Sequence, residues 1–254
     1  MAPDPINPVL DDIYASGTVR DAVGNERPAF PTSLSHADGK TLYDLVRNEN
    51  VQRSLEIGMA LGVSSLFILQ ALRENGGVRH IAIDPFQREW FNNIGPLNVE
   101  RAGFGDLFRF LPESSHTGLA RLIGEGAHFD FIFIDGNHRF EHTLVDFFLS
   151  ERLLRTGGHV MLHDPWLRSV RKAAAFILRN RADAFEPAAK YLDPPPSARS
   201  RALRLARFAW NHPLELATGL ALAPYNHRNC FVFRKTADHD EQYFAEHWDD
   251  YRSF

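Results

Sequence analysis

The sequence predicts an α/β fold in which helices cover both faces of a mainly parallel sheet. Short apolar segments alternate along the chain with segments of helical periodicity, and this alternation is typical of right-handed strand–helix–strand crossovers. The segment FDFIFID at residues 129–135 is almost continuously apolar, as expected of a strand that is covered on both faces. A chain of 254 residues, of which 44% are hydrophobic, is long enough to bury such a core.

The predicted elements follow one another from residue 39. A helix is expected over residues 39–51, because Leu42, Leu45 and Val46 share helical spacing. The later elements are the strand 53–57, the helix 63–74, the strands 80–84, 108–111 and 129–135, the helix 139–155, the strand 159–164, the helix 168–180 and the strand 231–234. Glycine pairs mark the end of the helix 63–74 and a turn at Gly157-Gly158.

Two regions interrupt this alternation. Residues 1–38 carry prolines that remove backbone donors and block helix interiors, so we expect an arm with little structure of its own. This arm is either a disordered tail or a cover for the active site or a dimer partner, and a homodimer is left open. The domain proper is expected over residues 39–254. Within it, residues 183–228 are too long for an ordinary connection, and residues 193–228 of this stretch are interpreted as a helical insertion that acts as a lid.

The insertion carries a group of arginines whose role has two interpretations. They form either a solvated basic helix face or a clamp for a phosphate or carboxylate of the substrate. The arginines are Arg199, Arg201, Arg204 and Arg207.

Composition excludes some classes of partner. The formal net charge is −4, so the strongly basic balance expected of a nucleic-acid-binding protein is absent. Cys230 is the single cysteine and cannot form an internal disulfide, which favours a reducing compartment. The N-terminal residues lack a signal-peptide pattern, and the apolar stretch at residues 214–224 is too short to span a bilayer. We therefore expect a cytoplasmic protein.

A glycine-rich loop follows the strand at residues 53–57. Gly58, Ala60 and Gly62 let the backbone turn tightly and approach a ligand. The spacing differs from the G-x-G-x-x-G sequence that holds the pyrophosphate of nicotinamide cofactors. S-adenosylmethionine (SAM) has no phosphate and carries an ammonium and a sulfonium, so the acid Glu56 beside the loop suits SAM. The alternative is a tight packing turn with a surface acid.

Acidic residues also end two later strands. Ligands of open α/β sheets bind outside the carboxyl ends of the strands, where the strand order reverses. Asp84 ends the strand 80–84, and its carboxylate can accept both hydroxyls of a ribose. Asp135 ends the most apolar strand and is followed by Gly136, Asn137 and His138. We expect Asp84 and Asp135 to lie beside the cofactor.

These segments resemble a known family. The strings SLEIGMALGVSS, IAIDPF and FDFIFIDGNHRFEHTLVDFFLSERLLRTGGHVMLHD are similar to those of class I SAM-dependent methyltransferases. More narrowly, they resemble the metal-dependent O-methyltransferases of the macrocin type and, more distantly, of the catechol type. The resemblance covers residues 39–182 and 231–235.

The resemblance implies a Rossmann-like, seven-stranded, mostly parallel sheet whose last strand is antiparallel. It implies that Glu56, Gly58 and Ala60 lie near the methionine part of SAM and that Asp84 binds the ribose. The turn Glu113-Ser114-Ser115 resembles the part of the family that lies beside the adenine.

The resemblance also implies a divalent metal, Mg²⁺ or Mn²⁺, held by Asp135 and Asp164. Two carboxylates leave positions for a substrate hydroxyl, whose pKa the metal lowers. In the alternative interpretation, these acids only cap strand-to-helix turns. His163 stands where family members often have a second acid, and it is either a ligand or a neighbour. Imidazole nitrogen suits Mn, Fe, Ni or Zn better than Mg.

His138 matches the histidine proposed as general base in the sugar-modifying members of the family. The pKa of an unperturbed histidine is near neutrality, as this role requires. The predicted function is therefore metal-dependent O-methylation of a small molecule, a sugar-like or phenolic intermediate of natural product biosynthesis. The alternatives are an N-methyltransferase or metal-independent methyltransferase on the same fold, a nicotinamide-dependent oxidoreductase, and an accessory subunit without turnover.

Overall fold

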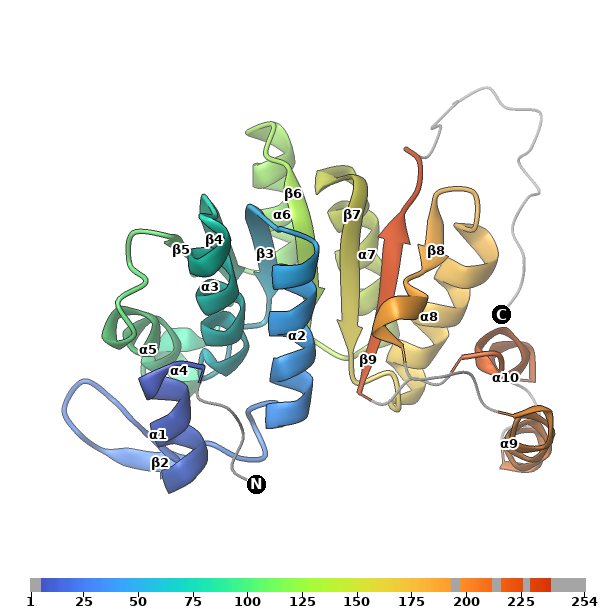
Figure 1. The fold of residues 1–254 in the computed structure, drawn as a ribbon, viewed down its shortest axis with the longest axis horizontal. Helices are drawn as coiled ribbons and strands as arrows, with labels where there is room; N and C mark the ends of the chain where they lie inside the picture. Colours follow the sequence, from blue (N-terminus) through green and yellow to red (C-terminus); the bar gives the residue numbers. More distant parts are fainter. Residues whose placement is uncertain (1–5, 193–196, 212–215, 226–228, 239–254) are drawn as a thin grey trace. The chain divides into compact units, whose positions relative to one another are not determined.

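The computed structural model describes residues 6–192, 197–211, 216–225 and 229–238, and the chain divides into two compact units, Met1–Gly136 and Asn137–Phe254. The strands of the first unit lie in the order β5 (Phe108–Leu111), β4 (Arg79–Ile83), β3 (Arg53–Ile57) and β6 (Phe129–Ile134), and those of the second in the order β7 (Leu154–His163), β9 (Cys230–Lys235) and β8 (Phe185–Pro187) (Figure 1). In the first unit, β3 is parallel to β4 and β6, and β4 is parallel to β5. In the second unit, β9 is antiparallel to β7 and β8. The predicted sheet with an antiparallel last strand is confirmed.

Helices cover both faces of the strands in the first unit. Side chains that follow one another along a strand point to opposite faces. Glu56 of β3 accepts a hydrogen bond from Ser65, which lies in α3 (Val63–Asn75). Ile83 of β4 pairs in register with Ile57, the residue after Glu56, so its side chain points to the opposite face of the sheet. On that face it packs against Gly118 in α6 (Ser115–Gly124). The remaining helices of this unit are α1 (Pro8–Ser16), α2 (His36–Asn48), α4 (Gln87–Trp90) and α5 (Ile94–Arg101).

The N-terminal arm is structured, and the expectation of little structure there is wrong. Asn7 caps α1 by accepting a hydrogen bond from the backbone of Val9, and a proline occupies the first turn, where it needs no hydrogen-bonded N–H. Leu10 and Ile13 of α1 are buried. A two-stranded hairpin follows, formed by β1 (Thr18–Arg20) and β2 (Glu26–Pro28).

The Tyr14 side chain of α1 contacts the segment before α2 and the helix α3. Its hydroxyl donates to the carbonyl of Leu34 at 2.9 Å, and its ring meets the ring of Phe67 edge-on. Burial raises the pKa of Tyr14 strongly, and the negative charge of Asp38 raises it further.

The second unit contains α7 (Phe140–Leu153), α8 (Arg168–Asn180), a short 3₁₀ helix at Ala189–Tyr191, α9 (Ala198–Asn211) and α10 (Leu216–Leu222). The predicted turn at Gly157-Gly158 is wrong, because both glycines lie inside β7. The insertion contains helices, as expected, but residues 193–196, 212–215 and 226–228 lie outside the described residues. Its role as a lid therefore stays a prediction. Within the described part of the chain, every helix is too short or too polar to cross a bilayer.

The path of the chain identifies the edge of the sheet where a ligand is expected. From β3 the chain builds outward through β4 and β5 and then returns to place β6 on the other side of β3. The strand order reverses at this point. Ligands of open α/β sheets bind outside the carboxyl ends of the two strands that flank such a reversal. The glycine loop after β3 and Asp135 after β6 lie at those ends.

Candidate active site

The loop at residues 58–62 follows β3 in a conformation that needs small residues. The φ angles of Gly58, Ala60 and Gly62 are +87°, +45° and +81°, in the region that side chains with a Cβ disfavour. A Cβ on Gly58 would collide with the carbonyl of Asp135, and one on Gly62 would lie 2.8 Å from the carbonyl of Gly95. The loop is therefore packed tightly against neighbouring backbone. Its contact with the methionine part of SAM stays a prediction.

Asp84 holds this loop in place. Its Oδ2 accepts hydrogen bonds from the backbone N–H groups of Met59 at 3.1 Å and Ala60 at 2.9 Å. Its Oδ1 accepts from the backbone of Phe86 at 2.8 Å. The residue is only 4% exposed. The structure thus gives Asp84 a role that the sequence did not predict, while the ribose contact stays a prediction.

Two buried amides, which sequence analysis missed, complete the support of the loop. Gln87 Nε2 donates to the carbonyl of Ala60 at 2.6 Å and to Asp84 Oδ2 at 3.0 Å, while its Oε1 accepts from Gly95 at 3.2 Å. Asn98 Nδ2 donates to the carbonyl of Leu61 at 3.1 Å. Both residues come from the segment after β4, which has no regular polar pattern that could have marked them.

Glu56 lies inside the first unit, so it is not the surface acid of the alternative interpretation. It is fully buried, and its Oε2 accepts from Ser65 and lies 3.2 Å from Nε2 of His80. His80 Nδ1 in turn lies 2.9 Å from the hydroxyl of Ser54. Among the described residues, Oε1 of Glu56 has no hydrogen-bond partner. A buried carboxylate needs such partners, because burial of an isolated charge is costly.

The turn predicted to lie beside the adenine begins α6. Ser114 is the N-cap of this helix, and Ser115 is its first residue. Glu113 forms an ion pair with Arg121 of the same helix. Their contact with the adenine stays a prediction.

A histidine and an acid face each other in the second unit. His138 Nε2 lies 3.2 Å from Oδ2 of Asp164, and both side chains are partly exposed. Asp164 follows β7 with a φ of +54°, a conformation that aspartate tolerates better than most residues. The indole N–H of Trp166 donates to Oδ1 of Asp164 at 2.8 Å, and His163 Nδ1 lies 3.6 Å from the same oxygen.

The surroundings of Asp164 favour its ionised form. Partial burial acts to raise the pKa of Asp164, but the hydrogen bond with His138, the charge of His163 and the hydrogen bond from Trp166 outweigh burial and lower the pKa below the ordinary value. An ionised carboxylate can orient an imidazole or bind a cation.

Asp135 precedes His138 by three residues and ends the first unit, after β6. The side chains of Asp135, His138 and Asp164 are all partly exposed. Their convergence on a metal ion, and the role of His163 there, stay predictions. Two carboxylates and one imidazole are a donor set that suits a divalent first-row metal ion.

A cavity of about 620 Å³ lies next to Asp164 in the second unit. Its lining includes the exposed ring of Trp166 and the side chain of Ser169, whose hydroxyl donates to the carbonyl of His138. The remaining lining residues are Phe140, Leu167, Arg168 and Lys172. The cavity therefore combines aromatic rings with basic groups beside the His138–Asp164 contact.

Known proteins are similar in sequence to the central part of this chain. Residues 55–165 match the sequence model of a family described as a methyltransferase domain. Tapetum-specific methyltransferase 1 of Arabidopsis thaliana is 30% identical over 117 residues, which are 45% of this chain and 47% of that protein. The chain spans about half the length of the curated relatives it matches.

Solved structures share the fold. An O-methyltransferase from Bacillus cereus in complex with SAH has a TM-score of 0.62 at 18% identity, covering 92% of this chain and 93% of that chain. The O-methyltransferase TomG from Streptomyces achromogenes, involved in tomaymycin synthesis and solved with SAM, has a TM-score of 0.57 at 20% identity, covering 81% and 82%. Residues 55–165 of this chain are therefore similar in sequence to methyltransferase domains, as the sequence motifs predicted, and the solved structures share its fold.

Proposed function

We propose that this protein is a SAM-dependent O-methyltransferase that acts on a small molecule. The similarity to methyltransferase domains supports SAM as the methyl donor. The observation that carries the choice of acceptor is the contact between His138 and Asp164, because an imidazole beside a carboxylate can bind and deprotonate a hydroxyl. In the reaction, the acceptor oxygen forms a bond to the methyl carbon while the bond from that carbon to sulfur breaks. The electron pair stays on sulfur, and the hydroxyl proton leaves to a base.

We also propose that Asp135, Asp164 and His138 hold a divalent metal ion. The chemistry of the donor set supports this proposal, because two carboxylates and an imidazole suit a divalent first-row metal ion, and the imidazole favours Mn²⁺ over Mg²⁺. When bound, such an ion lowers the pKa of a coordinated hydroxyl and positions it. The neighbouring hydrogen bond from Trp166 keeps the Asp164 carboxylate oriented.

The His138–Asp164 contact also favours a second candidate, a methyltransferase without a metal. In this case Asp164 orients the imidazole, and His138 takes the proton of the acceptor. The two candidates exclude one another at Nε2 of His138, because that atom cannot coordinate a metal while it carries the proton that it donates to Asp164; Nδ1 then acts as the base.

The cavity beside Asp164 supports a ring-shaped acceptor that carries an acidic group. Trp166 and Phe140 offer aromatic surface, and Arg168 and Lys172 offer positive charge. This composition favours a phenolic carboxylate over a neutral sugar. The acceptor is expected to place its hydroxyl toward His138.

The test measures SAH binding by calorimetry and methyl transfer from labelled SAM to a panel of phenolic carboxylates and sugars, with and without EDTA. SAH binding without methyl transfer in EDTA, restored by Mn²⁺, supports the metal-dependent reaction. Full transfer by metal-free protein in EDTA contradicts it and supports the second candidate. Failure to bind SAH contradicts both. Asp164→Asn should act like EDTA, whereas Glu186→Gln at the sheet edge removes the same charge and should leave transfer unchanged.

A further inference from the structure

The first unit has a basic cavity at the end of β3 that lies opposite the glycine loop. It has a volume of about 370 Å³. Small-molecule sites usually measure about 300–1,000 Å³, so the cavity is large enough for a small ligand. The five residues of β3 separate Arg53 at this end from Ile57 at the loop, a distance on the order of 13 Å at about 3.3 Å per residue. The cavity is therefore separate from the candidate active site.

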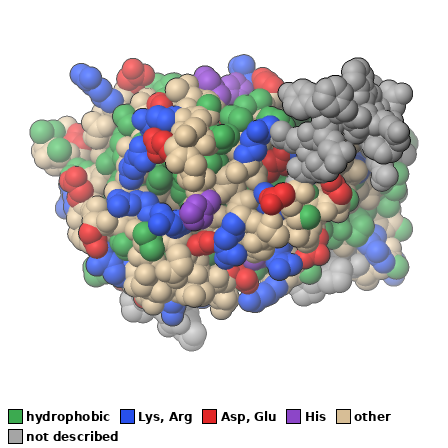
Figure 2. Space-filling view, turned by 90° about the horizontal axis from the view of Figure 1, so that it is seen from above, with side chains coloured by type: hydrophobic (Ala, Val, Ile, Leu, Met, Phe, Trp, Pro, Cys, Tyr) green, Lys and Arg blue, Asp and Glu red, His purple; other side chains and the backbone are tan. Residues whose placement is uncertain are grey.

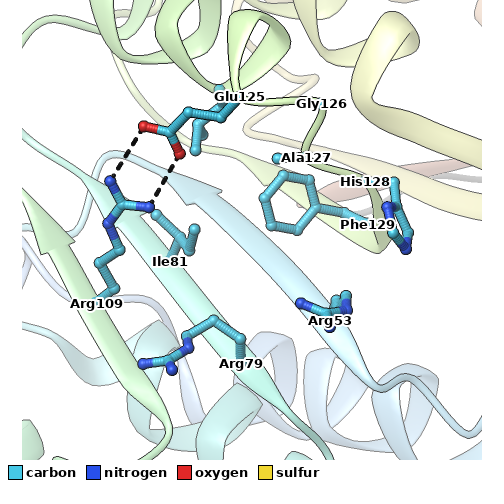
Figure 3. Close-up of a pocket in the computed structure, with 10 residues that line it drawn as sticks. Arg53, Arg79, Ile81, Arg109, Glu125, Gly126, Ala127, His128 and Phe129 are labelled. Carbon is cyan, nitrogen blue, oxygen red and sulfur yellow. Dashed lines mark hydrogen bonds and ion pairs between the residues drawn. The ribbon is translucent and has the colours of Figure 1, made fainter.

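Arginines from three neighbouring strands line this cavity (Figure 3). Arg53 begins β3 and pairs in register with Arg79, which begins β4. Arg109 of β5 lies across from Glu125 and forms an ion pair with it at 3.2 Å. Figure 2, which looks onto the end of the molecule where these parallel strands begin, shows basic side chains spread over this face.

Arg53 and Arg79 present an electrostatic problem. Their strands lie about 4.8 Å apart, and like charges that face each other on adjacent strands destabilise a sheet. Nearby acids do not neutralise these two guanidinium groups. Glu125 is bound to Arg109, and Oδ2 of Asp130 accepts the backbone N–H groups of Gln52 and Arg53. Within the described part of the chain, neither the Arg53 nor the Arg79 guanidinium has a hydrogen bond or ion pair to an acid.

The rest of the lining is apolar. Ile81 of β4 and Leu122 of α6 are lining residues, and Ala127 and Phe129 lie across from the arginines (Figure 3). The ring of His128 stands at the side. A ligand that fits this lining needs an anionic group for the two guanidiniums and an apolar part for these apolar side chains.

We propose that this cavity binds a small ligand that joins a phosphate group to an apolar part. A guanidinium group can bind two phosphate oxygens at once through two short, charge-assisted hydrogen bonds. Arg53 and Arg79 bind the phosphate together, which relieves the repulsion between them. The ligand acts apart from the methyl-transfer reaction, so the proposal does not depend on the proposed function.

The test is a titration followed by methyl NMR with three probes: phenyl phosphate, inorganic phosphate and benzoate. Saturable shifts of the Ile81 and Leu122 methyl signals are expected with phenyl phosphate, with weaker binding of the other two probes. The Met59 methyl signal, at the glycine loop, should not shift. The range should reach about 10 mM, at which a site with a Kd of ~1 mM is mostly filled. Absence of saturable shifts in this range overturns the proposal, and tighter binding of benzoate than of phenyl phosphate overturns the choice of phosphate.

Matched variants locate the binding. Arg53→Gln and Arg79→Gln should each weaken phenyl phosphate binding about tenfold or more, because each removes a charged pair of donors. Arg88→Gln in α4 removes the same charge from an exposed position and should change binding less than twofold, about the limit of such a titration. Equal effects of the three variants overturn the site and indicate general attraction of anions. If a glutamine variant fails to fold, Arg79→Lys replaces it, and unchanged affinity in that variant also counts against the proposal, because lysine lacks the planar fork.

Discussion

Oδ2 of Asp84 lies 2.9 Å from the backbone nitrogen of Ala60, so the acid that follows β4 fixes the loop that follows β3. This contact fixes the carboxyl end of β3 relative to the carboxyl end of β4. The loop has no polar side chain of its own that could accept these backbone N–H groups, and the carboxylate supplies the acceptors.

Asp84→Asn should weaken SAH binding about tenfold or more and lower the free energy of unfolding by about 1–3 kcal/mol. The amide keeps the shape but loses the charge and one acceptor oxygen, which leaves either the N–H groups of both Met59 and Ala60 or the N–H of Phe86 without a partner. Calorimetry and denaturant titration measure the two effects. Asp106→Asn, which removes an exposed acid from the same unit, is the control. Unchanged values for both quantities in Asp84→Asn would show that the contact does not stabilise the loop.

Gly58→Ala should impair folding far more than Gly76→Ala. Both glycines have positive φ, so both variants incur the conformational cost of about 1–2 kcal/mol. A Cβ on Gly76 meets nothing within 4 Å, whereas one on Gly58 meets the backbone of Asp135. The difference in unfolding free energy between the two variants isolates this collision. Equal losses of stability in the two variants would contradict the packing of the loop.

Asp164→Asn should weaken Mn²⁺ binding at least tenfold, because it removes an anionic ligand. His163→Asn should weaken it less than threefold, since His163 is not among the proposed ligands, and small electrostatic changes of about 0.5 kcal/mol correspond to such a factor. Electron paramagnetic resonance of free Mn²⁺ measures both affinities. A greater effect of His163→Asn would assign His163 as the ligand and return to the interpretation based on the sequence.

Tyr14→Phe should make stability less sensitive to alkaline pH. The pKa of Tyr14 is raised in the folded protein, so its contribution is complete below the ordinary tyrosine pKa of about 10 and falls as the pH rises above that value, where the unfolded chain loses the proton first. At neutral pH the variant should lose about 1 kcal/mol with the hydrogen bond to Leu34. Urea titrations at neutral and alkaline pH test this. Parallel losses of stability in both proteins above pH ~10 would contradict the assignment.

The sequence predicted the strands that carry the active-site edge, because their apolar runs are long and their ends are marked by glycine or acid. It failed where a local rule was applied too broadly. Pro8 was counted against helix formation, yet it occupies the first turn of α1, where proline is favoured. The three residues of β8 end in Pro187 and are too few to show a period, so this strand was missed.

The candidate site was predicted as a set of strand-end residues, and the supporting contacts were not. His138 and Asp164 were both named, but their separation of 3.2 Å depends on the fold, which brings together residues far apart in sequence. Gln87 and Asn98 are single polar residues in an irregular segment, and only burial distinguishes them. Glu56 was expected at the cofactor, which stays a prediction, and its contact with His80 on the neighbouring strand was not foreseen.

The order of the strands in the second unit has a consequence for synthesis. β9 comes last among the described strands, yet it lies between β7 and β8 and bonds to both. While the ribosome adds the intervening residues, the nascent β7 and β8 expose backbone groups that await this partner. Unpaired strand edges are templates for association with other chains. The strand at Cys230–Lys235 therefore completes the pairing of β7 and β8. We expect newly made chains to be most prone to aggregate just before this strand emerges from the ribosome.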